Sequence, residues 1–362
     1  MRVAKVACAL KDRIETTVVL PNDNSERFRE QLDKCNILYK ALSITRLSKQ
    51  LSVLLKYALF SIVEIIRLTA YFKNNGFDLV HVSGGAWQYK GLIAGKIAGC
   101  KVVWHLNDSK SPLPIRWFFS LLSRLPDYYI YSSNRTREYY SPLIKSISKS
   151  GMVIRPPVDT AYYSLECDDS GNILKQNYKY KYVIGTIANI NPIKNIEMLI
   201  RIASKVTREH KNTVFLIVGT ISKHQEPYYQ SLLKLIEEFE LINIVFTGAI
   251  DNVKPYLEIM DIYLCTSLHE TGPMTLWEAM SMEKPVITTD VGDVKDFVKN
   301  GVSGEVVAVD DINRMSEKVV MLLDDENVRM TYGKNARKAA VTGLDIKVCA
   351  DLHYDAYLQA IS

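Results

Sequence analysis

The chain has 362 residues, of which 48% are hydrophobic and 23% are charged. This length is more than one ordinary hydrophobic core organises, so we expect two domains. The six cysteines are scattered and form no C-x-x-C pair, which is typical of buried thiols in a reducing compartment and excludes a disulfide-rich secreted scaffold. The N-terminal residues do not have the pattern of a secretory signal, and we expect a cytoplasmic location.

The net charge of +5 hides a difference between the two parts of the chain. Residues 1–157 carry 24 Lys+Arg against 11 Asp+Glu, a net charge of +13, whereas residues 158–362 carry 21 against 29, a net charge of −8. A basic N-terminal part favours an anionic partner, such as a membrane surface or a lipid-linked phosphate. A soluble basic surface without a ligand is an equal alternative. The sequence contains no nucleic-acid-binding motif.

A helix is the first element that we expect, over Met1–Arg13, because apolar residues recur at helical spacing from Val3 to Leu10. A Rossmann-like unit instead begins with a strand, a glycine-rich turn and a helix, which together need about thirty residues. We therefore expect that this chain begins at an internal methionine and lacks that first strand and turn. The alternative is a strand over Arg2–Ala9 with a very tight connection to the next strand.

Strands and helical patterns alternate along the rest of the chain, which predicts α/β domains with parallel sheets. In the N-terminal half, strands are expected at Thr16–Leu20, Leu79–Val82, Lys101–His105 and Tyr128–Tyr131. In the C-terminal half, they are expected at Tyr182–Ile187, Thr213–Val218, Ile244–Thr247, Ile262–Cys265, Val286–Thr288 and Gly304–Val307. Helices are expected at Asn195–Arg208, Pro227–Glu240, Asp311–Leu323 and Asp345–Ile361.

Domain boundaries are suggested by the proline-stiffened segment Arg155–Asp159 and by the polar sequence that follows it as far as Lys181, which is typical of a linker. We therefore expect an N-terminal domain over residues 1–160 and a C-terminal domain over residues 161–344. The closing helix, over residues 345–362, is expected to pack back toward the N-terminal domain.

The segment Leu47–Phe72 is rich in apolar residues but is interrupted by Lys49, Lys56, Glu64 and Arg67. These charges exclude a membrane-spanning helix. A helix docked on its own sheet is one prediction for this segment, and an amphipathic helix resting on a membrane is another. The two predictions are compatible if one stripe of the helix faces each way.

The most informative stretch of the chain runs from Ser267 to Ser281 and carries two glutamates eight positions apart, Glu270 and Glu278. The apolar run Ile262–Cys265 precedes it and predicts a buried strand, so Glu270 is expected in the loop at the carboxyl end of that strand. A turn with glycine and proline follows, and the N–H groups of the helix start then make an anion site in the crevice where open α/β sheets bind ligands. Acids often occur at a helix start, but two carboxylates around a phosphate site suit a sugar nucleotide.

The sequence from Glu270 to Asp293 resembles the E-x7-E signature of retaining glycosyltransferases of family 4, which have the GT-B fold. The resemblance extends through most of the chain, weakly in the N-terminal half and strongly after Tyr182. It implies two Rossmann-like domains with parallel sheets facing a central cleft, with the nucleotide-sugar donor on the C-terminal domain and the acceptor on the N-terminal domain. It also implies transfer of a hexosyl residue with retention of configuration by front-face attack, in which the leaving diphosphate helps to take the acceptor proton.

Within the signature, the resemblance implies that Glu270 contacts the donor sugar near its reacting carbon and that Glu278 holds the ribose hydroxyls. The phosphates are expected at the turn formed by Gly272, Pro273, Met274 and Thr275, with help from the Thr275 hydroxyl. Pro273 is expected at the first helical position, where its missing N–H costs nothing.

The stretch Ile184–Ile200 looks like the segment that opens the family's nucleotide-binding domain, which implies that Lys194 contacts the donor diphosphate. A cation there stabilises the charge that develops as the glycosyl bond breaks. The family usually has an arginine a few residues earlier, where this chain has Asn189, so stabilisation of the leaving group is expected to differ. Gly248 resembles the glycine beside the nucleotide base, and Gly219 similarly ends a strand, although a turn glycine is the ordinary alternative at both.

His105 ends the predicted strand Lys101–His105 and resembles the family's histidine at the same place, which faces the cleft and contacts the donor sugar. A structural histidine is the alternative, but the position at the carboxyl end of a strand favours a role in the site. Glu270, His105 and Lys194 are therefore the candidate catalytic residues.

No metal site is predicted, because His269 lies beside Glu270 but no second histidine has ligand spacing. No cofactor is expected beyond the donor itself, a UDP- or GDP-sugar. The sequence thus favours a glycosyltransferase that acts on a glycan or lipid-linked acceptor in surface polysaccharide synthesis, in the cytoplasm or peripherally on the inner face of the membrane. The rivals are a non-catalytic sugar-nucleotide-binding protein of the same fold, including an inactive truncated product, and a sugar-nucleotide epimerase.

Overall fold

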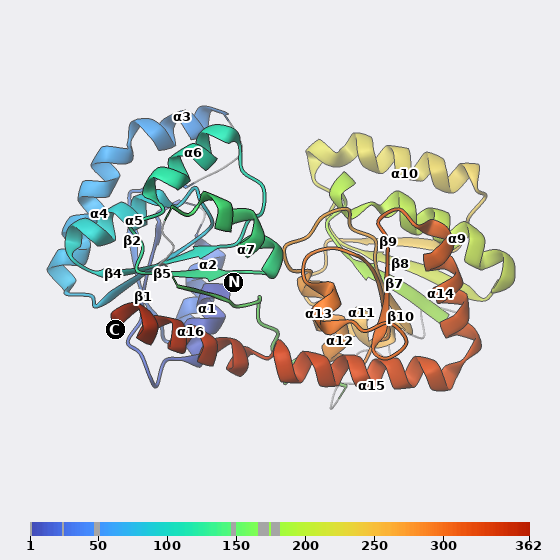
Figure 1. Cartoon of the computed structure of the whole chain (residues 1–362). Helices are drawn as coiled ribbons and strands as arrows, with labels where there is room; N and C mark the ends of the chain where they lie inside the picture. The colour runs from blue at the N-terminus through green and yellow to red at the C-terminus, as the bar shows by residue number, and fades with distance from the viewer. Residues whose placement is uncertain (1, 24, 47–50, 146–149, 166–173, 175–181) are drawn as a thin grey trace. The chain divides into compact units, whose positions relative to one another are not determined.

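The computed structural model describes residues 2–23, 25–46, 51–145, 150–165, 174 and 182–362 (Figure 1). The chain forms two compact units: the first consists of Met1–Pro157 and Ile346–Ser362, and the second of Val158–Asp345. Each unit contains parallel strands joined by helices, which confirms the predicted α/β class.

The strands of the first unit form two parallel sheets. One pairs β1 (Thr17–Pro21) with β2 (Leu38–Leu42), and the other has the order β3 (Leu79–Ser83), β4 (Lys101–Leu106), β5 (Tyr128–Tyr131) and β6 (Gly151–Val153). The four strands predicted in this half are present, whereas β2 and β6 were missed. No residue of β2 is fully buried and β6 has only three residues, so neither shows the buried alternation that identifies a strand.

The helices of the first unit are α1 (Arg2–Ala9), α2 (Glu26–Lys34), α3 (Leu51–Leu59), α4 (Ser61–Asn75), α5 (Tyr89–Ala98), α6 (Leu113–Leu122), α7 (Asn134–Tyr140) and α16 (Ile346–Ile361). The predicted helix at the start of the chain is confirmed by α1, and the alternative of a strand over the same residues is wrong. The single helix predicted over Leu47–Phe72 is instead two helices, α3 and α4, which meet at Phe60, and residues 47–50 lie outside the described part.

Helices cover both faces of the four-stranded sheet. Because side chains alternate along each strand, every strand contributes apolar residues to both helical layers. In β4, Val102 and Trp104 pack in the cluster formed with α4, α5 and α6. Val103 packs with α1 and α16, and His105 lies against His353 of α16 on the same face. The closing helix α16 therefore belongs to the first unit, where it lies beside α1 (Figure 1).

A six-stranded parallel sheet forms the centre of the second unit, in the order β12-β11-β10-β7-β8-β9. Its strands are β7 (Tyr182–Ile187), β8 (Thr213–Val218), β9 (Ile244–Gly248), β10 (Ile262–Cys265), β11 (Val286–Thr289) and β12 (Gly304–Val307). All six were predicted, with ends that differ by at most one residue. From β7 the chain adds β8 and β9 on one side and then returns to add β10 on the other. This reversal places the loops after β7 and β10 side by side, which is where such sheets bind ligands.

Seven α-helices in the described part of the second unit pack against this sheet. They are α9 (Ile196–Glu209), α10 (Glu226–Glu238), α11 (Lys254–Ile259), α12 (Met274–Ser281), α13 (Val294–Phe297), α14 (Ile312–Asp324) and α15 (Glu326–Gly343). Alternation along β8 divides the core: Val214 and Leu216 pack with α11, α12, α13 and α15, whereas Phe215 and Ile217 pack with α9, α10 and α14. Helix α15 was not predicted.

Two predicted boundaries change in the structure. Pro273 precedes α12 as its N-cap and is not its first helical residue, a shift of one position. The predicted linker lies largely outside the described residues, but its beginning belongs to the second unit, since the N–H of Val158 donates to the carbonyl of Leu344. No helix in the described residues has both the length and the apolar character needed to cross a membrane.

Candidate active site

A cavity of about 370 Å³ opens in the second unit, where β7 and β8 end and α12 begins. Seven of the predicted site residues line it: Asn189, Lys194, Glu270, Gly272, Pro273, Met274 and Thr275. The rest of the lining is Ile187, Ala188, Val218, Gly219, Thr220, Ile250 and Val253. The structure therefore brings most of the residues singled out in the sequence together at the switch point of the sheet.

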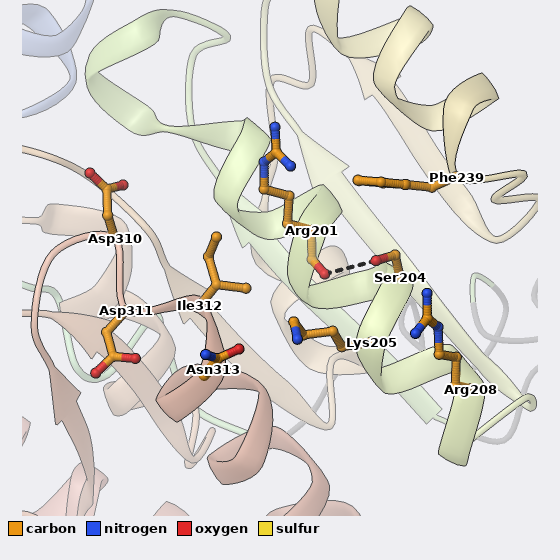
Figure 2. Close-up of a pocket in the computed structure, with 9 residues that line it drawn as sticks. All are labelled: Arg201, Ser204, Lys205, Arg208, Phe239, Asp310, Asp311, Ile312 and Asn313. Carbon is orange, nitrogen blue, oxygen red and sulfur yellow. Dashed lines mark hydrogen bonds between the residues drawn. The ribbon is translucent and has the colours of Figure 1, made fainter.

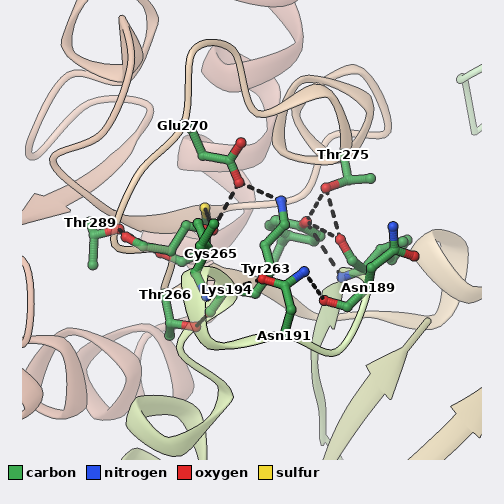
Figure 3. A network of polar contacts seen from close by, with 12 residues as sticks. Asn189, Asn191, Lys194, Tyr263, Cys265, Thr266, Glu270, Thr275 and Thr289 are labelled. Atoms are coloured by element: carbon green, nitrogen blue, oxygen red, sulfur yellow. Dashed lines mark hydrogen bonds and ion pairs between the residues drawn. The ribbon is translucent and has the colours of Figure 1, made fainter. Parts of the chain in front are cut away.

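A charged pair lies in the wall of this cavity. The ammonium of Lys194 donates a hydrogen bond to Oε1 of Glu270, and the hydroxyl of Ser267 donates to the same oxygen at 3.0 Å (Figure 3). The two charged side chains are 25% and 15% exposed, and no other charged residue lines the cavity among those that the structure describes. An anion that enters the cavity therefore meets the ammonium of Lys194, which is paired with Glu270 in the structure.

Hydrogen bonds to main-chain carbonyls connect the loop after β10 to the loop after β7. The hydroxyl of Thr266 donates to the carbonyl of Lys194 at 2.9 Å (Figure 3). The N–H of Leu268 donates to the carbonyl of Ile193 at 2.8 Å. These bonds fix the positions of Lys194 and Glu270 relative to each other without a ligand, which is the preorganisation that electrostatic stabilisation needs.

The start of α12 supplies the second feature of an anion site. The first N–H groups of a helix have no partner within the helix and favour a negative charge. The hydroxyl of Thr275 donates to the carbonyl of Ile187 at 2.9 Å and accepts from the hydroxyl of Tyr263 at 2.7 Å (Figure 3). Its proton is therefore committed to the protein, and the main-chain N–H groups of the helix start are the better candidates to bind a phosphate.

Glu278 lies in the second turn of α12 and is 8% exposed, so it is outside the lining of the cavity. Its carboxylate is hydrogen-bonded to the side chain of Tyr163. Burial, followed by the negative charge of Glu278, raises the pKa of Tyr163, which keeps the phenol protonated as a donor.

Tyr163 was not singled out in the sequence, and its main chain is tied to α12 and α15. Its carbonyl accepts hydrogen bonds from the hydroxyl of Ser281 at 2.6 Å and from the guanidinium of Arg337 at 3.2 Å. These bonds anchor the main chain of the residue whose phenol is hydrogen-bonded to Glu278. An aromatic residue in a polar segment gave no signal in the sequence, because its partner lies more than a hundred positions away along the chain.

The two candidate glycines behave differently. Gly219 has φ +158°, and a Cβ there would lie 2.0 Å from the carbonyl oxygen of Ala188, so only glycine fits where the two loops approach. Gly248 has φ +74°, a Cβ there would meet only open space, and its carbonyl accepts from the N–H of Gly219 at 3.1 Å. Gly219 lines the cavity, whereas Gly248 acts on it through this hydrogen bond.

His105 is placed inside the first unit and is 1% exposed. Its ring stacks on His81 at 5.3 Å, Nδ1 lies 3.1 Å from Nε2 of His81, and its Nε2 has no hydrogen-bond partner among the described residues. Burial first, and then the positive charge of Arg2, lowers the pKa of His105 well below its ordinary value, so the ring is neutral. The first exposed side chain after β4 is that of Asn107. The resemblance implied that His105 faces the cleft and contacts the donor sugar. Within the first unit, its position in β4 directs the side chain toward α16, and its contact with a donor stays a prediction.

A second cavity of about 380 Å³ lies along α9 and contains none of the predicted site residues (Figure 2). It is lined by Arg201, Ser204, Lys205, Arg208, Phe239, Asp310, Asp311, Ile312 and Asn313. Two of its acids act on the protein itself, since Asp310 accepts from the side chain of Asn195 and Asp311 caps the start of α14. Among the residues that the structure describes, no group of three His, Cys, Asp or Glu side chains is placed to hold a metal ion.

Comparisons with known proteins agree with this geometry. Residues 1–162 match the family model described as Glycosyltransferase Family 4, and residues 172–339 match the one described as Glycosyl transferases group 1. Together the two matches span most of the chain, and each of them likens one part of it to a glycosyltransferase domain. The crystal structure of Anabaena HepE in complex with UDP and glucose has a TM-score of 0.82 and 19% sequence identity, covering 99% of this chain and 95% of that one. This likeness shows the fold and confirms the predicted GT-B architecture.

Two curated relatives illustrate the range of the family. The UDP-Gal:alpha-D-GlcNAc-diphosphoundecaprenol alpha-1,3-galactosyltransferase of Escherichia coli is 22% identical over 82% of this chain and 79% of that protein. The capsular polysaccharide biosynthesis glycosyltransferase CapM of Staphylococcus aureus is 28% identical over 43% of this chain and 40% of that protein. For several curated relatives, the chain spans only 39 to 50% of their length.

Proposed function

We propose that the protein transfers a hexosyl residue from a nucleotide sugar to a glycan or lipid-linked acceptor, with retention of the anomeric configuration. The observation that carries this proposal is the pair of Lys194 and Glu270 in the wall of a cavity that also contains the start of α12. This arrangement offers a cation and a helix start to a diphosphate, and a carboxylate to a sugar. No metal or resident cofactor is part of the proposal.

The bound donor changes the partner of Lys194 in this mechanism. Its diphosphate lies on the N–H groups at the start of α12 and competes with Glu270 for the ammonium. Glu270 is then free to accept hydrogen bonds from hydroxyls of the sugar. As the glycosyl bond breaks, negative charge grows on the leaving diphosphate, so its attraction to Lys194 is stronger in the transition state than in the ground state.

The nucleoside occupies the less polar part of the site. The base lies against Ile250 and Val253, near the narrow approach at Gly219. The ribose hydroxyls donate to Glu278, whose carboxylate keeps the hydrogen bond from Tyr163 on its other side. The base therefore makes apolar contacts, and the diphosphate makes charged ones.

Retention follows from attack on the same face of the sugar that the leaving group departs from. An oxygen of the leaving diphosphate takes the proton of the acceptor hydroxyl as the new bond forms. Glu270 is the one carboxylate among the described residues that line the cavity, and here it orients the sugar without forming a covalent bond. The buried His105 has no contact with the donor in this mechanism, and its predicted catalytic role is tested separately.

Names of similar proteins support the choice of substrates. The HepE structure contains UDP and glucose, and the E. coli relative is named for UDP-galactose and a diphosphoundecaprenol-linked acceptor. We therefore propose a UDP- or GDP-sugar donor and a lipid-linked or growing surface polysaccharide as acceptor, met at the inner face of the membrane.

A sugar-nucleotide-binding protein without turnover is the second candidate. It is favoured by Asn189, which is exposed and lines the cavity where a second cation would support the leaving group. The experiment that separates the two is a screen of UDP- and GDP-sugars for nucleotide release, with polyprenyl-diphosphate sugars as acceptors. Release by the natural chain that is abolished in Lys194→Met supports the transferase. Tight nucleotide binding without release under any condition supports the binding protein.

A further inference from the structure

Nine large apolar side chains point into solvent from three helices of the first unit. Leu59 is 77% exposed, Ile62 73%, Leu113 75% and Trp117 71%. The set, which we call the apolar ridge, comprises Leu55, Leu59, Phe60, Ile62, Val63 and Ile66 on or between α3 and α4, and Leu113, Trp117 and Leu121 on α6. Single exposed apolar residues are ordinary on protein surfaces, but a contiguous group marks an interaction site.

The ridge lies opposite the faces by which these helices join the core. On α6, Leu113, Trp117 and Leu121 follow each other at a spacing of four and so share one side, whereas Phe119 and Leu122 are buried under the helix. On α4, Leu68 and Phe72 are buried, while Ile62 and Ile66 face outward. The helices are therefore apolar on both sides, which docking on the sheet alone does not require.

The helices that carry the ridge are neighbours. Tyr57 of α3 packs edge-on against Tyr89 at the start of α5, with ring centroids 5.6 Å apart. Tyr89 in turn packs edge-on against Phe118 of α6 at 4.9 Å. Helices α3 and α6 thus flank the start of α5 and lie next to each other in the first unit (Figure 1).

A buried ion pair holds this surface in place. Lys90 of α5 lies 2.5 Å from Glu64 of α4, and both side chains are 5% exposed. The ammonium of Lys90 also lies 3.4 Å from the centre of the Tyr57 ring, and the N–H of Thr45 donates to Glu64 at 2.9 Å. Glu64 is the single acidic residue in the sequences of α3, α4 and α6, so this pairing removes their one carboxylate from the surface.

The charges that remain around the ridge are positive. The three helices carry Lys56, Arg67, Lys73 and Arg116, and Lys110 and Arg124 flank α6. Apolar side chains with a tryptophan, bordered by cations and without exposed carboxylates, have the composition of a surface that lies in the interface of an anionic bilayer. A protein partner that bound the ridge would need acidic residues of its own to balance these six cations. A second copy of this chain would instead place its own cations against them, and the like charges would repel.

We propose that the apolar ridge inserts into the headgroup region of an anionic lipid bilayer and holds the first unit on the membrane. The inference deepens the proposed function and rests on it for its purpose, since a lipid-linked acceptor is presented at that surface. Binding itself is independent of sugar transfer and is measured without donor or acceptor.

Trp117 provides a direct readout of insertion. Trp104 and Trp277 are at most 1% exposed and Trp87 is half-buried, whereas Trp117 is 71% exposed. With vesicles of phosphatidylcholine and phosphatidylglycerol, its emission is expected to shift to shorter wavelength and to be quenched by brominated lipids. Pure phosphatidylcholine is expected to bind the protein far more weakly, because each cation near an anionic surface contributes about fivefold to binding.

Two sets of variants test the surface by vesicle sedimentation. Ile62→Ser with Ile66→Ser is expected to weaken binding to the anionic vesicles by at least about tenfold, since two exposed side chains lose their transfer into the bilayer. Lys56→Gln with Lys73→Gln is expected to weaken it and to reduce its dependence on salt. The matched control is Ile242→Ser, which removes a 93% exposed apolar side chain of the second unit and is expected to bind as the natural chain does.

Three results would overturn the proposal: no binding of the natural chain to anionic vesicles, equal binding by the Ile62/Ile66 variant, or self-association in solution that this variant abolishes. The last would identify a second copy as the occupant. Nucleotide release without vesicles is expected to be unchanged in all these variants. Vesicle binding without nucleotide release in the natural chain would contradict the proposed function while leaving the membrane surface standing.

Discussion

Lys194 and His105 are both polar residues near the carboxyl end of a parallel strand, yet the structure places them in opposite environments. Lys194 follows β7 in a loop that lines a cavity, and its side chain is 25% exposed. His105 lies within β4, paired with Ser83 and Ile130 on the neighbouring strands, and is 1% exposed. Inside a strand the alternation of side chains decides which way a residue faces, whereas beyond the last paired residue the loop decides. A polar residue near the carboxyl end of a strand therefore indicates a ligand-binding site only when it lies beyond the residues that pair with neighbouring strands.

The largest effect is expected when Lys194 is removed. Lys194→Met takes away the one cation in the described part of the cavity lining, so kcat for nucleotide release is expected to fall about 100-fold or more. The free energy of unfolding is expected to change by less than about 1 kcal/mol, because the pair with Glu270 is partly exposed. Steady-state kinetics and thermal unfolding measure the two quantities.

Lys205→Met is the matched control for this substitution, since Lys205 is exposed on α9 and lines only the second cavity. It is expected to leave kcat unchanged. A Lys194→Met protein that retains most of its activity would show that Lys194, like Lys205, makes no contribution to nucleotide release.

The buried histidines are expected to make the first unit sensitive to acid. Burial lowers the pKa of His81 to about 3, and it also lowers the pKa of His105 and His353 well below the ordinary value, with Arg2 adding to the effect. Because these pKa values are lower in the folded state than in the unfolded state, the neutral rings stabilise the fold above about pH 6.5. That stability is lost as the pH falls toward 3, at up to about 1.4 kcal/mol per pH unit for each histidine.

Chemical denaturation between pH 7 and pH 4 measures this slope, and His105→Leu is expected to make it shallower by roughly one third. His224→Gln, which replaces an exposed histidine of the second unit, is the matched control. Nucleotide release in His105→Leu also tests the catalytic prediction: at neutral pH and low temperature, activity close to that of the natural chain assigns His105 a structural role. A loss of kcat in a fully folded variant would restore the catalytic one.

Tyr163 offers a smaller and more specific effect. Tyr163→Phe removes the hydrogen bond to Glu278 but leaves the main-chain bonds from Ser281 and Arg337. The loss of about 1 kcal/mol is expected to raise KM for the donor about fivefold with little change in kcat, since Glu278 contacts the ribose and not the reacting atoms. Tyr162→Phe is the control, because its hydroxyl bonds to Asn252 at the exposed surface. Equal KM values for the two variants would remove Tyr163 from the site.

The smallest expected effect is a gain. Asn189→Arg adds a second cation to the cavity, where charge develops on the leaving group, and is expected to raise kcat a few fold. Asn313→Arg is the control, because it adds the same charge to the second cavity, for which no role is proposed. An increase in both variants would indicate a general effect of charge and not one of position.

Much of the second unit could be predicted because its strands are continuous apolar runs, as expected for a parallel sheet buried on both faces. Ile262–Cys265, followed by glycine, proline and a helical pattern, defined the loop of Glu270 correctly. The first unit was harder, since β2 has no fully buried residue and resembles a surface segment.

Contacts between distant residues escaped prediction. The hydrogen bond from Tyr163 to Glu278 depends on how a segment near the unit boundary crosses α12, and no spacing rule encodes it. The commitment of the Thr275 hydroxyl to Ile187 was missed for the same reason. The side of the sheet on which His105 lies was predictable in principle: Trp104 and His105 are adjacent in one strand, so their side chains face opposite helical layers.

The central claim is that Lys194 exchanges Glu270 for the diphosphate of the donor. Calorimetric titration of the natural chain and of Lys194→Met with the released nucleoside diphosphate and with the matching nucleoside tests it most directly. The natural chain is expected to prefer the diphosphate by about 100-fold, and Lys194→Met is expected to lose most of that preference while binding the nucleoside unchanged. A Lys194→Met protein that keeps the full preference would show that the helix start alone binds the diphosphate, and it would contradict the mechanism.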